Sequence, residues 1–591
     1  MRRHWITATA LAVTLAAGLL QAPVALARAQ KTFDIVEKTY VVKTRDAKIY
    51  VEIAHAAQGD KIVRAPSVFT YSPYSILGDR RNNDASEWTP QGYHRVWADV
   101  IGTGNSGGCY DYGGDREKRT AHDLVEWIAK QKWSTGKVGM FGASYEGTTA
   151  TAAAVTKPKG LTTIVPEAAI SRWYGYAYSG GIRYLLNNEQ PADEGFDTPA
   201  LFDFGLAVPP PVDVQGDDWA GRVESAITPC DEITHTEHGY DDTPDYDKFW
   251  TERDYLKDAD EIRIPVMVVH NWGDYNVKQE EGWNLFNALK NSANRKMFFG
   301  ERYSGHGVPG GAYNKTLHAW MDHYLKGVDN GVEDIPTITS QTADFFGPGK
   351  FLSADKVKTR DIELIAQETT KTTPTDYEWK LLPTKPQMGF QAPTPATWLS
   401  MGGNLESHMN HHARSHHEWW YFESPPLKKD TRIFGEIKVK AWVTADREWV
   451  TLTPTILDIN PGCHRTEANQ HVVNPTPECN PRSFYSVTRG FLDSRYRDGL
   501  AKQKLVTPNQ SFQMTVVQKP TDYTFKKGHQ IGLQVAGEII EWHVPKVYPC
   551  QSDVCANIKL DWENGQTRVV LPVVNGPRNP MDLFDFGGHH H

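Results

Sequence analysis

The sequence predicts an α/β fold followed by an all-β domain. From about residue 32 to 335, strand-like and helical segments alternate, which favours a mostly parallel sheet covered on both faces. After about residue 335, strand-like segments recur with turn residues between them, a pattern typical of a jelly roll or β-sandwich. The length of 591 residues fits two or three domains.

The first 29 residues have the pattern of an export signal. Arg2 and Arg3 precede an apolar stretch over 6–20, and small-residue Ala-x-Ala sites follow at 25–27 and 27–29. The apolar stretch is too short for a membrane span, and no later segment reads as one. We therefore expect a signal peptide over 1–29 and a secreted, extracellular protein that does not span a membrane.

The N-terminal domain is expected over 30–335. Alternating apolar residues over 32–56 predict its opening strands. Apolar patterning predicts further strands at 63–71, 93–100, 137–143, 161–165, 264–270 and 296–300, and helices at 120–132, 146–155, 278–291 and 315–326. The segment from about 172 to 258 breaks the alternation and is rich in Tyr, Pro, Asp and Gly. Because insertions in such sheets lie over the carboxyl ends of the strands, we interpret it as a cap.

The second domain, expected over 336–588, contains few helical patterns. Its predicted strands lie at 360–366, 433–444, 449–459, 483–491, 511–518, 530–537 and 566–573. The loop 407–417 holds five histidines, which suit either an exposed polar loop or a metal site, and we interpret it as the loop. The three C-terminal histidines receive no role. Nothing in the sequence calls for a metal or an organic cofactor.

Charge and cysteine content narrow the function classes. The net charge of −9, without a long Lys/Arg run, excludes an ordinary nucleic-acid-binding protein. The six cysteines of an exported chain are expected to be oxidised. Proximity in the sequence suggests two bridges, and the remaining two cysteines then form a long-range one. The suggested pairs are Cys463 with Cys479, Cys550 with Cys555, and Cys109 with Cys230.

Two glycine-flanked serines are candidates for a nucleophile. Gly104-Asn105-Ser106-Gly107-Gly108 fits the Gly-x-Ser-x-Gly pattern, whereas in Gly142-Ala143-Ser144-Tyr145-Glu146-Gly147 the closing glycine comes one residue late. A nucleophile elbow needs a strand, a sharp turn and then a helix, whose N-terminus stabilises developing negative charge. Only Ser144 has this context, because Ser106 leads into a glycine-rich loop. We therefore interpret Ser144 as the nucleophile of an α/β-hydrolase fold.

A base and its carboxylate partner are expected after the nucleophile, in the chain order Ser, Asp or Glu, His. Asp274 follows the apolar strand 264–270, and His306 follows the strand 296–300. Since parallel strands end at the same sheet edge, both side chains are expected near Ser144. The sequence therefore predicts a Ser144, Asp274, His306 triad.

Several segments resemble the family of α/β-hydrolases that contains Xaa-Pro dipeptidyl-peptidases, cocaine esterase and α-amino-acid ester hydrolases. They are Asp99-Val100-Ile101-Gly102-Thr103-Gly104, Gly136-Lys137-Val138-Gly139-Met140, Ser144-Tyr145, Val165-Pro166-Glu167-Ala168-Ala169-Ile170-Ser171-Arg172-Trp173-Tyr174, Phe249-Trp250-Thr251-Glu252-Arg253-Asp254-Tyr255 and His270-Asn271-Trp272-Gly273-Asp274-Tyr275-Asn276-Val277. The last of these is similar to the dipeptidyl-peptidase branch, where the triad acid lies in an Asp-x-Asn-Val segment.

The resemblance implies a C-terminal jelly roll and an oxyanion hole with two donors, the Tyr145 amide and the Tyr74 hydroxyl of the Pro73-Tyr74 turn. Without the resemblance, Tyr74 reads as a packed surface aromatic. The sequence departs from the peptidase branch at Glu146, where a glycine or similar residue is usual. This departure leaves the expected fold and triad in place and puts the substrate assignment in doubt.

A dipeptidyl-peptidase needs an aromatic pocket for proline and a carboxylate for the substrate's free amine. Tyr145, Trp173, Tyr174 and Trp272 are candidates for the pocket, Glu189, Asp193 and Glu194 for the amine, and Asn276 for the amine or carbonyl. Each carboxylate reads equally well as part of a solvated acidic loop. The expected partner is a peptide or a small ester or amide. The alternatives are an esterase or acylase of the same fold, and a non-catalytic polysaccharide- or surface-binding protein.

Overall fold

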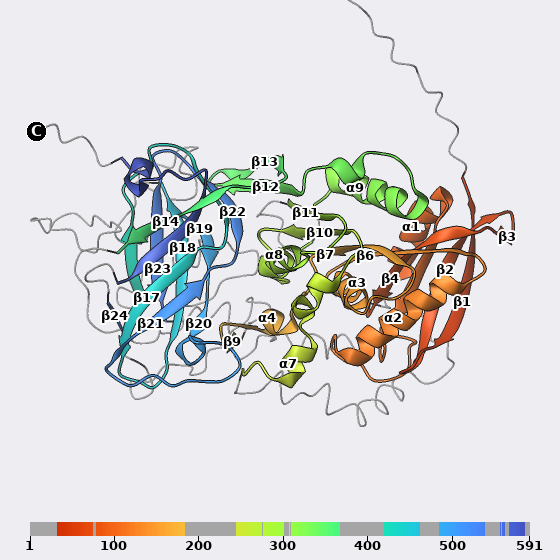
Figure 1. The fold of residues 1–591 in the computed structure, drawn as a ribbon, viewed down its shortest axis with the longest axis horizontal. Helices are drawn as coiled ribbons and strands as arrows, with labels where there is room; N and C mark the ends of the chain where they lie inside the picture. Colours follow the sequence, from red (N-terminus) through yellow and green to blue (C-terminus); the bar gives the residue numbers. More distant parts are fainter. Residues whose placement is uncertain are drawn as a thin grey trace, which may run out of the picture.

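The structure is a computed structural model. It describes residues 32–74, 78–183, 244–274, 276–300, 306–307, 309–366, 419–460, 484–537, 556, 558–561 and 566–585. Figure 1 shows two domains side by side, an N-terminal one with helices around a sheet and a C-terminal one made of strands. In the described part of the chain, no helix combines the length and apolarity needed to cross a membrane.

The N-terminal domain is built on one mixed sheet with the spatial order β1-β2-β5-β4-β6-β7-β10-β11-β12-β13. The six strands from β5 to β11, and β12 beside them, run parallel. The bounds are β1 Asp34–Lys43, β2 Lys48–Gln58, β4 Ala65–Ser72, β5 His94–Asp99, β6 Ser134–Ala143, β7 Leu161–Glu167, β10 Val266–Asn271, β11 Arg295–Gly300, β12 Ile338–Asp344 and β13 Gly347–Ala354. A short strand β3, Lys61–Ile62, pairs antiparallel with the end of β2.

Helices cover both faces of this sheet, in agreement with the continuous burial along β4, β5 and β10. On β4, Val68 packs in one apolar cluster with residues of α1 and α9, while Phe69 packs in the opposite cluster with residues of α2, α3 and α8. The helix bounds are α1 Gly78–Trp88, α2 Asp115–Lys130, α3 Tyr145–Val155, α8 Gln279–Ala288 and α9 Ala312–Met321. Short helices α4 Trp173–Ala177 and α7 Lys248–Glu252 lie at the edge facing the second domain (Figure 1).

The C-terminal domain is a sandwich of two antiparallel sheets around its own apolar core. One sheet has the order β15-β23-β18-β19, with β20 also paired to β18. The other joins β14, β25, β16, β22, β17, β21 and β24. The bounds are β14 Thr359–Ile365, β15 Trp419–Glu423, β16 Thr431–Gly435, β17 Lys438–Ala445, β18 Thr451–Ile459, β19 Phe484–Arg489, β20 Leu492–Asp493, β21 Ser511–Val517, β22 Thr521–Phe525, β23 Gln530–Ala536, β24 Ile558–Asp561 and β25 Arg568–Val574.

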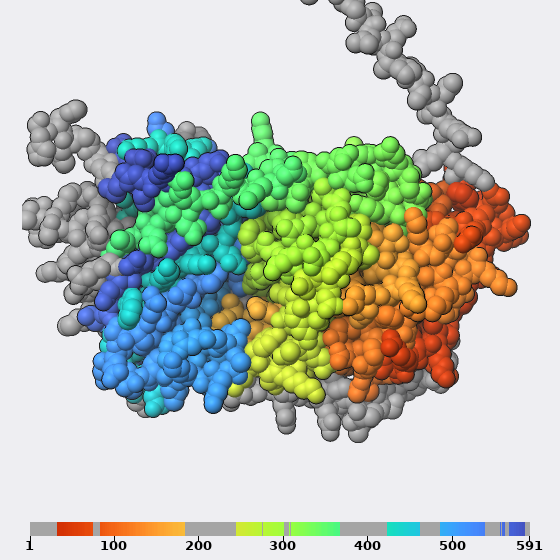
Figure 2. Space-filling view, in the orientation of Figure 1, coloured from red at the N-terminus to blue at the C-terminus, as the bar shows by residue number. Residues whose placement is uncertain are grey.

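One strand joins the two domains. β12 pairs with β11 of the first sheet and with β22 of the sandwich, parallel in both cases. Across the same boundary, the Lys519 ammonium pairs with Glu280, and the rings of Trp283 and Phe434 lie 5.5 Å apart. Figure 2 shows the two domains packed directly against each other. The sandwich is therefore packed directly against the first domain and shares strand pairing with it through β12.

The predicted α/β fold with an all-β second domain is confirmed, and two local predictions need correction. The helix α1 was missed because its sequence is polar and only Ala85 and Trp88 of its described side chains are buried. The single strand predicted at 433–444 is two strands, β16 and β17, because the backbone turns at Gly435, where φ is 114°. The signal segment, most of the predicted cap and the histidine loop lie outside the described residues.

Candidate active site

Ser144 lies in a strained turn between β6 and α3. Its φ of 61° and ψ of −125° are unusual for a residue with a side chain, and its amide donates to the Glu167 carbonyl at 2.8 Å. Gly147 makes this turn possible, because a Cβ there would lie 2.6 Å from the Gly142 carbonyl oxygen. The serine is thereby held at the carboxyl edge of the sheet and remains half-buried rather than enclosed.

Two tyrosines flank this serine. The Tyr74 hydroxyl, from the turn after β4, donates to Ser144 Oγ at 3.4 Å. Tyr145 is the first residue of α3, so its amide lies at the positive end of the helix dipole. The structure therefore brings both predicted oxyanion donors to the nucleophile.

An acid and an imidazole meet at the same edge. Asp274 follows β10 and is buried, and its Oδ2 accepts a 2.9 Å hydrogen bond from His306 Nδ1. Burial alone would lower the pKa of His306, but the hydrogen bond and charge of Asp274 raise it above its ordinary value. The Asn276 amide also donates to Asp274, at 3.0 Å, so each carboxylate oxygen has a partner.

Tyr176 is linked to Asp274 through Asn276. The Tyr176 hydroxyl donates to Asn276 Oδ1 at 2.8 Å, and the Asn276 backbone amide donates to Asp274. Sequence reasoning did not single out Tyr176, although it lies in the aromatic run that begins at Trp173.

Lys278 was also missed. It is buried, its ammonium donates to the Tyr176 carbonyl at 2.6 Å and lies 4.6 Å from the centre of the Tyr176 ring. Burial lowers its pKa to about 7, helped by the charge of Lys519 and opposed by Glu280 and Glu281. Its position directly after the Asp-x-Asn-Val segment was the only available signal.

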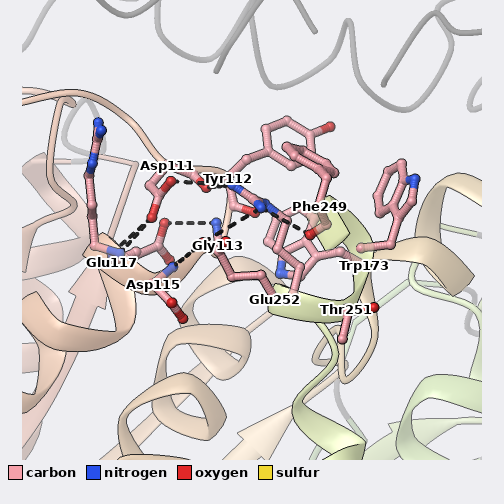
Figure 3. A network of polar contacts seen from close by, with 12 residues as sticks. Asp111, Tyr112, Gly113, Asp115, Glu117, Trp173, Phe249, Thr251 and Glu252 are labelled. Atoms are coloured by element: carbon pink, nitrogen blue, oxygen red, sulfur yellow. Dashed lines mark hydrogen bonds and ion pairs between the residues drawn. The ribbon is translucent and has the colours of Figure 1, made fainter. Parts of the chain in front are cut away.

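Behind the nucleophile lies a buried polar network (Figure 3). Glu117, on α2, accepts from the Tyr145 hydroxyl at 2.7 Å and from the Gly113 amide at 3.1 Å. Burial raises the pKa of Glu117 to about 7, although both of these hydrogen bonds lower it. Figure 3 shows Glu117 beside Asp111, which pairs with Arg253 at 3.2 Å. Through Glu117, this network holds the hydroxyl of Tyr145, the residue after Ser144.

Ser106, the competing serine, has a structural position. Its hydroxyl donates to the Asp99 carbonyl at 2.8 Å and accepts from the Tyr50 amide at 3.0 Å. It is buried in the glycine-rich turn, and no helix follows it directly. The Ser106 hydroxyl thus uses its hydrogen and one of its lone pairs in hydrogen bonds to the backbone.

The predicted pocket aromatics are all buried. Trp173 donates to the Tyr255 hydroxyl at 3.0 Å, and Tyr174 donates to the Pro244 carbonyl at 2.7 Å. Trp173 also packs edge to face on Tyr145, so it lies next to the nucleophile turn. Trp272 lies farther back, where its indole donates to Ser340 Oγ on β12 at 2.9 Å.

Some predicted site residues cannot be placed. The amine-anchor candidates Glu189, Asp193 and Glu194 lie outside the described residues. So do five of the cysteines, namely Cys230, Cys463, Cys479, Cys550 and Cys555. Cys109 is described, and it is not a free cysteine. The three pairings therefore stay predictions.

Chemically, the arrangement offers a half-buried hydroxyl with a tyrosine donor at its oxygen, and an imidazole held by a carboxylate in loops that follow other strands of the same parallel sheet. A strand–turn–helix serine, followed along the chain by an acid and a histidine at later strand ends, is the geometry of the α/β-hydrolases. The fold and the site together define that class of protein.

Comparison with known proteins narrows the class. Residues 48–305 match the model of the X-Pro dipeptidyl-peptidase (S15 family), and residues 330–545 match that of the X-Pro dipeptidyl-peptidase C-terminal non-catalytic domain. A Xaa-Pro dipeptidyl-peptidase homologue from Streptomyces avermitilis is 27% identical over 82% of this chain and 74% of its own. The two domains of the chain are therefore similar to the catalytic and the C-terminal domains of Xaa-Pro dipeptidyl-peptidases.

Solved structures share the whole architecture. A CocE/NonD family hydrolase from Staphylococcus aureus has a TM-score of 0.65 and 18% identity, covering 92% of this chain and 94% of its own. An α-amino acid ester hydrolase has a TM-score of 0.63 and 18% identity, covering 94% of this chain and 100% of its own. At these identities the likeness shows the fold of both domains and not the substrate.

Proposed function

We propose that this protein is an exported serine peptidase that releases N-terminal Xaa-Pro dipeptides through an acyl-enzyme on Ser144. The observation that carries the proposal is the pairing of Asp274 with His306 at the sheet edge that presents Ser144 and Tyr74. Similarity to Xaa-Pro dipeptidyl-peptidases supports a peptide substrate.

The hydrogen bond to Asp274 decides how His306 acts. Because Nδ1 of His306 donates to the carboxylate, Nε2 carries the lone pair and serves as the base. It takes the Ser144 proton as the hydroxyl attacks the substrate carbonyl, and returns it to the leaving amine. Asp274 holds the imidazole tautomer and stabilises the imidazolium. Water, activated by His306, then hydrolyses the acyl-enzyme.

The negative charge that develops on the carbonyl oxygen needs donors already in place. The Tyr74 hydroxyl and the Tyr145 amide flank Ser144 and are suited to this task. Loss of one such donor typically lowers kcat by about a hundredfold to a thousandfold. Since the ground-state hydroxyl of Tyr74 already points at Ser144 Oγ, little reorganisation is needed.

The prolyl ring requires an aromatic wall beside the nucleophile. Trp173 and Tyr176, 6.1 Å apart and edge to face, stand between Tyr145 and Asn276 and supply it. The free amine of the substrate requires a carboxylate, for which Glu189, Asp193 and Glu194 remain the candidates, and Asn276 is a candidate contact for the amine or the carbonyl.

Export and disulfides complete the proposal. The charged start, apolar stretch and Ala-x-Ala sites of residues 1–29 support cleavage of a signal peptide. Oxidising surroundings then suit the three predicted bridges. Mass spectrometry of the secreted protein would give its N-terminus, and non-reducing peptide maps would give the cysteine pairs.

The activity is tested with Gly-Pro- and Ala-Pro-p-nitroanilide, N-acetyl-Ala-Pro-p-nitroanilide and short p-nitrophenyl esters. Ser144→Ala is compared with Ser106→Ala, the matched change at the other glycine-flanked serine. We expect cleavage of the free-amine anilides, lost in Ser144→Ala and retained in Ser106→Ala. Ester cleavage alone would move the assignment to an esterase or acylase. Activity that survives Ser144→Ala would contradict the triad, and no turnover of any substrate would favour a binding protein.

A further inference from the structure

Glu146 is an acidic residue enclosed next to the nucleophile. It stands two residues after Ser144, in the first turn of α3, and only 5% of its surface is exposed. Its Oε1 accepts a 2.8 Å hydrogen bond from the hydroxyl of Ser72, the last residue of β4. The carboxylate thus crosses from the nucleophile helix to the neighbouring strand end.

The contact continues to the tyrosine turn. The Ser72 hydroxyl accepts a 3.0 Å hydrogen bond from the Tyr74 amide, and the Tyr74 side chain ends at Ser144 Oγ. Four residues therefore form a closed ring, in which Ser144 and Glu146 belong to α3 and its cap while Ser72 and Tyr74 belong to β4 and its turn.

The Glu146 carboxylate fixes the direction of the hydrogen bonds that join these four residues. A serine hydroxyl has one hydrogen, so once it is donated to the carboxylate, the oxygen lone pairs face the Tyr74 amide. A charged acceptor makes that bond stronger than a neutral one would. Gly142 leaves room for this side chain, because a Cβ at that position would lie 2.4 Å from Glu146 Cβ.

We propose that Glu146 and Ser72 are positioning residues that hold the Tyr74 hydroxyl at the oxyanion position relative to Ser144. The inference rests on the proposed function, since it gives a task to two residues outside the triad. It also accounts for an acidic residue at a buried position directly after the Ser144-Tyr145 pair.

A double-mutant cycle tests this inference. Tyr74→Phe removes the donor and is expected to lower kcat for Ala-Pro-p-nitroanilide about a hundredfold. Ser72→Ala displaces the donor and is expected to lower kcat roughly tenfold without changing KM. If Ser72 acts through Tyr74, the double variant is no slower than Tyr74→Phe alone.

The matched control is Ser67→Ala. It removes a buried hydroxyl from the same strand, and Ser67 Oγ has no hydrogen-bond partner among the described residues. We expect wild-type kcat from this variant. Losses of Ser72→Ala and Tyr74→Phe that multiply in the double variant, or equal kcat in Ser72→Ala and Ser67→Ala, would overturn the inference.

A second pair of variants tests the carboxylate. Glu146→Gln keeps an acceptor for Ser72 and is expected to retain most of kcat, whereas Glu146→Leu removes it and is expected to behave like Ser72→Ala. Equal losses in both variants would overturn the role of the acceptor. Full activity of Tyr74→Phe would remove the oxyanion role itself and this inference with it, while additive losses overturn the inference and leave the proposed function intact.

Discussion

The indole nitrogen of Trp272 donates a 2.9 Å hydrogen bond to Oγ of Ser340, and so ties the loop before Asp274 to strand β12. Ser340 in turn donates to Asp522 of β22 at 2.6 Å. Nε and Nη2 of Arg432 donate to the two carboxylate oxygens of Asp522. All three of the linked residues Trp272, Ser340 and Asp522 are fully buried. The loop that carries Asp274, the predicted acid of the triad, is therefore supported by the second domain.

This support makes Trp272→Phe informative. The change keeps an aromatic ring and removes the donor, so we expect the free energy of unfolding to fall by about 1–3 kcal/mol. Because the Asp274 loop loses an anchor, kcat should fall as well. Trp320→Phe is the matched control, since it removes a 2.7 Å indole bond to Thr163 Oγ1 on the other face of the sheet. Denaturant unfolding and steady-state kinetics should show similar destabilisation in both variants and lower kcat in Trp272→Phe alone. An equal kcat in the two variants would contradict the support role.

The raised pKa of His306 sets the pH dependence of the proposed reaction. The neutral imidazole is the active form, so kcat/KM should increase with pH, with a midpoint above the ordinary histidine value. Asp274→Asn removes the charge that raises this pKa, so the midpoint should move to lower pH while kcat falls by roughly four orders of magnitude. Asp260→Asn removes the same charge from an exposed turn before β10 and should leave the midpoint in place. If Asp274→Asn leaves the midpoint unchanged, the group that titrates in the pH profile of kcat/KM is not His306.

Glu117 should make stability depend on pH in the neutral range. Its pKa is about 7 in the folded protein, against an ordinary value of 4.5, so the folded state binds the extra proton between these limits. The stability that Glu117 contributes is therefore present below pH 4.5 and is lost as pH rises through 7. Glu117→Gln is neutral at every pH and keeps an acceptor for Tyr145.

The difference in unfolding free energy between Glu117→Gln and wild type should therefore grow with pH, by at most about 1.4 kcal/mol per pH unit, and level off above pH 7. Glu37→Gln changes an exposed glutamate of β1 and serves as the control. Denaturant titrations at several pH values between 5 and 8 measure both variants. A constant difference across that range would show that Glu117 is ionised throughout.

The limits of prediction from sequence are visible in these residues. Asp274 and His306 could be predicted because each follows an apolar strand, and strand periodicity is a local signal. Glu117, Lys278 and Ser72 could not, because their partners Tyr145, Tyr176 and Glu146 lie 28, 102 and 74 residues away and only the folded sheet brings them together. Trp272 was predicted from its neighbours in the sequence, but β12 and β22, which surround it, were not predicted as strands.

A buried pair of histidines should give the opposite pH dependence to Glu117. His55 Nδ1 lies 3.2 Å from His94 Nδ1, and the outer nitrogens contact the Tyr40 hydroxyl at 3.1 Å and the Trp133 carbonyl at 3.1 Å. The Ala56 amide also donates to His94 Nδ1 at 3.2 Å, so this nitrogen is an acceptor and Nε2 of His94 donates to Trp133. With Tyr40 donating to His55 and His55 to His94, both rings are neutral. Burial lowers the pKa of His55 to about 3, with the charge of His94 adding to the effect, and burial lowers the pKa of His94 to about 4.

Both rings are therefore neutral in the folded protein at pH values where the unfolded chain, with an ordinary histidine pKa of 6.5, already binds protons. The stability they contribute is fully present above pH 6.5 and is lost as pH falls towards 4, by about 1.4 kcal/mol per pH unit for each histidine. Replacing both with glutamine should flatten this slope, whereas replacing the half-buried His323 of another element should not. Denaturant unfolding between pH 4.5 and 7.5 measures the slope, and an unchanged slope in the double variant would place the acid sensitivity of the fold elsewhere.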